Sequence, residues 1–238
     1  MWLVLCAAND LAALWAARGL AARGLQPLEI VTAEALAYNL RFEHRLTANQ
    51  PSVKITLADQ RVIDGALVRG TLNRLQLIPS AHLCGANATD RQYAEQELYA
   101  LTLSWLSGLP GRMLNRPTPQ GLGGEWRHSS EWFWLAAQAG LSTATYQQSD
   151  ARETSAALAH TATRTRIIVR DICCDPTVPP SVADGCARLA QLSGTDLLGL
   201  DFYLTPAGDW IFTNATPLPD LRSGGASLLD ALADALQS

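Results

Sequence analysis

Hydrophobic positions divide the chain into short buried strands and helices with one apolar face. The first apolar run, residues 2–7, is continuous, which is typical of a strand buried on both faces of a parallel sheet. An Ala/Leu-rich helix follows, with Asn9 or Asp10 as its N-cap, and residues 27–33 form a second apolar run. This strand–helix–strand start predicts a parallel α/β sheet.

The next part of the chain has a different pattern. Residues 53–63 alternate between apolar and polar positions about a turn at 58–60, which predicts a β-hairpin. Residues 65–69 predict another buried strand. A long amphipathic helix is expected to begin near Asp90 and to end before Pro110.

A Pro/Gly-rich connection over residues 111–126 marks the expected boundary between two lobes. We expect an N-terminal α/β lobe of residues 1–115 and a smaller α+β lobe of residues 116–238. The second lobe opens with a Trp-rich helix that has a Ser N-cap, ends at Gly140 and is followed by a strand. Residues 147–163 are small and polar, which predicts a loop or a short helix.

The rest of the second lobe predicts a mainly antiparallel sheet, because β-branched and aromatic residues are dense in three segments. The expected strands are residues 164–174, 197–204 and 210–215. Helices are expected at residues 179–194, where prolines precede the first turn, and at residues 227–237.

Charge, hydropathy and cysteine spacing narrow the possible partners. The net charge is −4 and the basic residues form no cluster, so we expect no nucleic-acid partner. No apolar run approaches the length of about 18 residues that a membrane span needs, so we expect no membrane partner.

The cysteines are Cys6, Cys84, Cys173, Cys174 and Cys186. Their spacing fits no zinc pattern and is typical of free thiols in the cytoplasm. His82 and Cys84 can share a strand face, but two ligands are too few for a metal site.

Several motifs occur in an order that points to a known fold. "MLNRPTP" (113–119), "SSEWFWLAAQAGLSTATY" (129–146) and "RTRIIVRD" (164–171) are followed by "GLDFYLTPAGDWIFTNATP" (199–217). In this order they resemble the ATP-binding half of the ATP-grasp superfamily, especially its peptide- and amino-acid-ligase branch. The resemblance implies a two-lobed ATP-grasp-like fold and matches Arg166 to an arginine that contacts phosphate or substrate.

The sequence departs from this family at the residues that hold the nucleotide. Asp201 matches the first acid of the family's magnesium site, whereas Asn214 stands at the glutamate position and Thr216 at the asparagine position. An amide and a hydroxyl do not supply the negative charge that Mg²⁺ needs. The interval 147–163 has neither the lysines nor the Gly-rich loop that the family places there. The Gly-rich stretch 121–126 does not join a strand to a capped helix, as phosphate loops do. We therefore expect no cofactor and no metal.

Three hypotheses on function remain open. The first is a non-catalytic ATP-grasp-like accessory protein that binds a peptide or protein partner in a cleft between the lobes. The expected cleft residues are Arg69, Asn73, Arg166, Asp201, Asn214, Trp126 and Trp132. The second is an ATP-dependent carboxylate–amine ligase, or another enzyme, with a rebuilt site. The third is a scaffold whose missing subdomain comes from another chain. The competing interpretation is that these side chains only hold the lobes together. A homodimer through the apolar stretch 11–25 is also expected.

Overall fold

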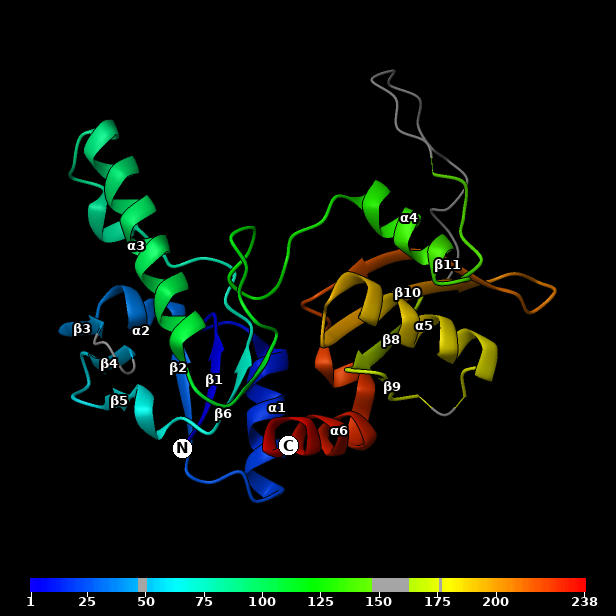
Figure 1. Ribbon diagram of the computed structural model, residues 1–238, viewed down its shortest axis with the longest axis horizontal. Coiled ribbons are helices and arrows are strands. Elements are labelled where there is room, and N and C mark those ends of the chain that lie inside the picture. The colour runs from blue at the N-terminus through cyan, green and yellow to red at the C-terminus, as the bar shows by residue number, and fades with distance from the viewer. Residues whose placement is uncertain (47–50, 147–162, 176) are drawn as a thin grey trace. The chain divides into compact units, whose positions relative to one another are not determined.

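The computed structural model describes residues 1–46, 51–146, 163–175 and 177–238. The described chain divides into two compact units (Figure 1). Unit 1 comprises Met1–Glu125 with Leu232–Ser238, and unit 2 comprises Trp126–Ala231. Unit 1 contains a parallel sheet and unit 2 an antiparallel one, which confirms the predicted α/β class.

The central sheet of unit 1 is parallel because helices, rather than tight turns, connect its strands. Its order is β2 (Leu28–Thr32), β1 (Trp2–Cys6), β6 (Gly70–Asn73) and β7 (Arg112–Leu114). Every residue of β1 is buried, which explains its continuous apolar run. Helix α1 (Leu11–Ala22) connects β1 to β2.

Helix α1 buries most of its apolar residues inside unit 1. Asp10 caps it, because the Asp10 carboxylate accepts a hydrogen bond of 2.9 Å from the Ala13 N–H. The buried residues of the helix are Ala12, Ala13, Ala16, Ala17 and Leu20. Leu11 is 61% exposed. The apolar stretch that suggested a homodimer is thus largely used within the unit, and dimerisation stays a prediction.

A small antiparallel sheet follows the short helix α2 (Ala33–Ala37). It consists of β3 (Arg41–Leu46), β4 (Pro51–Thr56) and β5 (Val62–Asp64), and the β4–β5 pair is the predicted hairpin. The strand predicted at residues 65–69 is wrong. Asp64 accepts a hydrogen bond from the Ala66 N–H and caps a 3₁₀ turn, η1 (Gly65–Leu67), so β6 begins only at Gly70.

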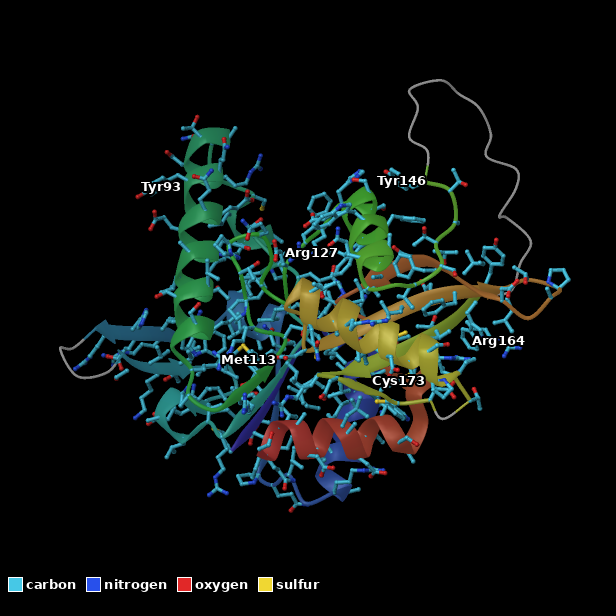
Figure 2. The ribbon with its side chains drawn as sticks, turned by 45° about the vertical axis from the view of Figure 1, so that its right-hand side comes forward. Tyr93, Met113, Arg127, Tyr146, Arg164 and Cys173 are labelled. Carbon is cyan, nitrogen blue, oxygen red and sulfur yellow. The ribbon has the colours of Figure 1, made fainter. Side chains whose placement is uncertain are left out.

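The predicted long helix is α3 (Ala88–Gly108), which follows the 3₁₀ turn η2 (Ala81–Leu83). Its C-terminal half carries Trp105 and Leu106 into the core of unit 1, where both side chains are fully buried. Its N-terminal half is mostly exposed. Tyr93 lies there with 64% of its surface exposed and points outward (Figure 2).

The sheet of unit 2 has the order β11 (Trp210–Thr216), β10 (Leu197–Leu204), β8 (Thr163–Val169) and β9 (Ile172–Cys173). All its pairs are antiparallel, as predicted. The single strand predicted at 164–174 is wrong. It folds into the β8–β9 hairpin, since Arg170 adopts a left-handed backbone with φ of 59°.

Helices α4 (Ser129–Gln138) and α5 (Pro180–Ser193) pack on one face of this sheet (Figure 1). His128, not a serine, caps α4, because its Nδ1 accepts the Ser130 N–H at 3.3 Å. The strand predicted after Gly140 is wrong, since only an isolated bridge joins Thr143 to Phe212. The loop or short helix predicted at 147–163 lies outside the described residues, except for its last residue in β8.

Helix α6 (Gly225–Gln237) follows the 3₁₀ turn η3 (Leu221–Gly224) and confirms the predicted closing helix. Among the described residues, no helix is both long and apolar enough to cross a membrane.

Candidate functional site

Asp201 lies on a polar face of the unit 2 sheet. It stands opposite Asn214 on β11 and opposite Thr165 on β8. The Thr165 hydroxyl donates a hydrogen bond of 2.7 Å to Asp201 Oδ1. Side chains in register on neighbouring antiparallel strands point to the same face, so Asp201 and Asn214 are neighbours there. This face offers one carboxylate, one amide and one hydroxyl.

A β-bulge creates this arrangement. The β10–β11 register shifts after Asp201, so that Phe202 pairs with Phe212 and Thr213 is the extra residue. The Thr213 hydroxyl donates to the Asp201 carbonyl oxygen at 3.0 Å. The bulge lets Phe212 and Ala215 both enter the core while Asn214 remains exposed.

Arg166 lies on the opposite face of the same sheet. Its register partner is Leu200, a core residue, whereas Asp201 pairs with the preceding Thr165. The Arg166 guanidinium lies 4.9 Å from the centre of the Trp210 ring, and its Nε lies 3.2 Å from Asp175 Oδ2. The structure therefore does not bring Arg166 together with Asp201. These contacts, and the hydrogen bond of 2.9 Å that Arg166 Nη1 donates to the Thr165 carbonyl oxygen, all lie within unit 2.

Arg69 and Asn73 lie at opposite ends of β6. Asn73 follows Arg69 by four positions, or about 13 Å at the usual rise per residue. Arg69 precedes the strand, and its guanidinium lies 5.2 Å from the centre of the Trp2 ring. Asn73 is fully buried.

The Asn73 side chain forms hydrogen bonds with the connection that follows β7. Its amide donates to the Asn115 carbonyl at 3.0 Å and to the Leu122 carbonyl at 2.6 Å, and its Oδ1 accepts the Leu75 N–H at 3.2 Å. All these partners belong to unit 1. A partner therefore cannot reach the buried Asn73 side chain in the folded unit, whereas a contact of Arg69 with a partner stays a prediction.

The three tryptophans at the start of unit 2 differ in exposure. Trp132 is 3% exposed and belongs to the core, with the Arg127 guanidinium 5.7 Å from its ring centre. A partner cannot reach Trp132 in the folded unit, which corrects the expectation that it lines a cleft. Trp126 and Trp134 are 67% and 60% exposed.

Trp126 belongs to a cluster of aromatic rings near the start of α4. Its ring centre lies 6.4 Å from that of His128, which lies 6.5 Å from that of Tyr146. Tyr146 in turn lies 5.1 Å from Phe133 and stands at the edge of the described residues (Figure 2). This cluster offers ring faces to an apolar or aromatic ligand group.

Within the described residues, no three His, Cys, Asp or Glu side chains form a group that can hold a metal ion. His82 and Cys84 do not share a strand face as predicted, because they lie in and just after the 3₁₀ turn η2. Burial raises the pKa of Cys6 to about 11 and those of Cys174 and Cys186 to about 12, so these thiols stay protonated and are poor ligands.

A pocket of about 450 Å³ in unit 1 was not expected from the sequence. It lies where β1, β2 and β6 reach their carboxyl ends. Its lining residues are Ala7, Asn9, Asp10, Ala33, Glu34, Arg74, Gln76, Leu77 and Pro79. One general rule could have predicted it from the sequence. Open parallel sheets bind ligands at their carboxyl edge, at the point where the strand order reverses.

No protein-family model and no curated protein matches the sequence. The solved structures give clear matches, among them macrocyclase MdnC from Microcystis aeruginosa bound with its precursor peptide MdnA. That match has a TM-score of 0.73 at 12% identity and covers 99% of each chain. The chain has the same fold as this macrocyclase.

Two further matches have the same fold. One is a RiPP-associated ATP-grasp ligase from Chryseobacterium gregarium, in complex with ADP and a leader and core peptide. It matches with a TM-score of 0.70 at 9% identity, covering 98% of this chain and 96% of that one. The other is the ATP-grasp ligase PsnB with a minimal precursor variant, Mg and ADP, at a TM-score of 0.69, 16% identity and 98% coverage of each chain. The two-lobed ATP-grasp-like fold predicted from the motifs is confirmed.

Proposed function

We propose that this protein is a non-catalytic, ATP-grasp-like accessory protein that binds a peptide or protein partner in peptide or protein modification. The similar structures support a peptide partner, because several of them contain a precursor peptide. Recognition of a peptide uses surfaces that do not depend on the nucleotide site, so it can persist where the chemistry is lost.

The register between Asp201 and Asn214 carries the non-catalytic part of the proposal. Asn214 is the direct cross-strand neighbour of the Asp201 carboxylate, and it is neutral. A site for Mg²⁺ between phosphates relies on carboxylate ligands. One carboxylate that already accepts a hydrogen bond from Thr165 is a weak anchor for such an ion.

Exposed aromatic residues are the proposed contact on unit 2. Trp126 and Trp134 each leave well over half of their surface uncovered, and large exposed aromatic side chains are enriched in binding hot spots. Arg166 and Trp132 are poor probes of binding, because both have structural roles within unit 2.

The test is capture of a partner by the tagged full chain, with the captured peptide identified by mass spectrometry and resynthesised. The double variant Trp126→Ala/Trp134→Ala should bind the synthetic peptide at least about tenfold more weakly. Tyr93→Ala removes an equally exposed aromatic residue from unit 1 and serves as the matched control. Undiminished binding by the folded double variant would rule out these tryptophans as the contact.

An ATP-dependent carboxylate–amine ligase with a rebuilt site is the alternative function. It requires ATP to bind, whereas the accessory function does not. Titration with the nucleotide therefore separates the two.

A further inference from the structure

The pocket at the carboxyl edge of the unit 1 sheet has the geometry of a ligand site. β2 lies on one side of β1 and β6 on the other, so successive strands are added in opposite directions from β1. Side chains that follow these three strands line the pocket. Its volume of about 450 Å³ falls within the range of sites for small ligands or a few residues of a peptide.

A buried ion pair forms one wall of this pocket. Arg74 Nε lies 2.7 Å from Asp10 Oδ2, and the two side chains are only 7% and 17% exposed. Asp10 Oδ1 also accepts the Ala13 N–H as the cap of α1. The charges of Arg74 and Asp10 therefore largely cancel, and the pair stiffens the wall.

Glu34 leaves the pocket with an excess negative charge. Its Oε2 accepts the Ala8 N–H at 3.0 Å, and within the described residues its Oε1 has no hydrogen-bond or ion-pair partner. The buried Cys6 thiol nearby supplies no charge. Burial raises its pKa to about 11, and the charges of Asp10 and Glu34 act in the same direction, against that of Arg74.

The other lining residues include apolar and neutral polar groups. Leu77 is 62% exposed and lies near Pro79, so the two offer a surface to an aliphatic chain. The side-chain amides of Asn9 and Gln76 make no hydrogen bond within the described residues and line the same pocket. They are available to the donors and acceptors of a peptide backbone.

We infer that this pocket binds the basic side chain of a peptide, with the cationic head on Glu34 and the aliphatic stem against Leu77 and Pro79. A lysine or arginine side chain fits this chemistry, because it joins an apolar stem to a cation. The inference that the ligand is a peptide rests on the proposed function. The cation site itself rests on the pocket alone.

Leu77 connects this pocket to a second hollow, which favours a peptide over a free amine. The second hollow has a volume of about 300 Å³. It is lined by Leu77, Ile78, Ser80, Glu95, Leu98 and Tyr99. A peptide that places a basic side chain in the first pocket can place an apolar neighbour in this hollow.

The experiment is an amide NMR titration of the full chain with two probes that differ only in charge. Nα-acetyl-lysine methylamide should shift amide signals of residues 7–10, 33–34 and 76. Nα-acetyl-norleucine methylamide has a similar stem without the ammonium and should not shift them. Equal shifts by both probes, or no shift by the lysine probe at its highest soluble concentration, would overturn the cation site.

The variant Glu34→Gln keeps an acceptor for the Ala8 N–H and removes the charge. It should weaken binding of the lysine probe about fivefold or more. Glu97→Gln, on the exposed half of α3, is the matched control and should change nothing. An unchanged affinity in Glu34→Gln contradicts the assignment of Glu34.

A third probe tests the peptide part separately. Acetyl-Lys-Leu methylamide should bind more tightly than the lysine probe, and Leu98→Ala should remove the gain. If the two probes bind equally, the second hollow plays no part and the peptide assignment is wrong. Neither probe depends on the tryptophans of unit 2, so failure here leaves the test of the proposed function intact.

Discussion

Asn214 faces Asp201 across the β10–β11 pair, which makes the missing acid testable at one position. Asn214→Glu places two carboxylates directly opposite each other and should lower the free energy of unfolding by about 1 kcal/mol. Added Mg²⁺ should restore part of this loss, because it binds between the two acids. Thermal melts with and without Mg²⁺ measure both effects. Asn214→Gln is the control, and a variant that melts like it under both conditions would show that residue 214 does not share a face with Asp201.

Asn73 is predicted to be a structural residue of unit 1. Asn73→Ala removes four hydrogen bonds, among them the amide donor to two carbonyl oxygens of buried residues, which should cost about 2–4 kcal/mol. Urea unfolding measures the loss. Gln92→Ala, at an exposed position of α3, should lie within about 0.5 kcal/mol of the wild type. A small effect of Asn73→Ala would mean that the connection at 115–122 does not depend on this amide.

The buried thiols predict a loss of stability at alkaline pH. Cys6, Cys174 and Cys186 have raised pKa values of about 11 to 12 in the folded chain, mainly because of burial. A raised pKa stabilises the folded chain below the thiol's ordinary pKa of about 8.5, and this contribution is lost as pH rises toward the folded values.

Urea titrations from pH 7 to 10 should therefore show a falling free energy of unfolding, reduced in slope by Cys186→Ala. In the folded chain at pH 8, Cys84 should react first with a thiol reagent, since it is exposed. Rapid reaction of all five thiols without denaturant would contradict this burial.

At the scale of elements, Gly111 is predicted to fix the entry to β7. Its φ is +80°, and an added Cβ would lie 2.1 Å from the Arg69 carbonyl oxygen. Gly24 has a similar φ of +87° but nothing within 4 Å of that position. Gly24→Ala should cost about 1–2 kcal/mol from backbone strain. Gly111→Ala should cost at least about 2 kcal/mol more, because backbone must move. Equal losses in urea unfolding would exclude the close approach.

The elements that the sequence predicted well are those with a local signal. The continuous apolar run of β1, the helical spacing in α3 and the prolines before α5 each identify an element without reference to the rest of the chain. The predicted β4–β5 hairpin and the β10–β11 pair have the same basis.

The elements that were missed depend on single backbone positions. Arg170 breaks the expected strand by adopting a left-handed φ, which its residue type does not favour. The sequence also placed Arg166 beside Asp201, because it gave no register between β8 and β10. The lining of the pocket around Glu34 was missed for a similar reason, since it gathers residues from three separate strand ends.

At the scale of the whole molecule, the ATP-grasp fold is present, but we propose that the ATP-dependent chemistry of ligases with this fold is not. The fold is shared with ligases that were solved with nucleotides and precursor peptides. The proposal assigns this chain only the binding of a peptide. Its central claim is that the chain does not use ATP.

Isothermal titration of ATP·Mg²⁺ into the full chain tests this claim most directly, with PsnB as the positive control and a cooperative unfolding transition as proof that the sample is folded. The account predicts no saturable heat at concentrations where an ATP-dependent enzyme is saturated, that is, up to about 1 mM. A saturable isotherm with a dissociation constant in the low-micromolar range, about 1–10 μM, would contradict the account and favour the ligase.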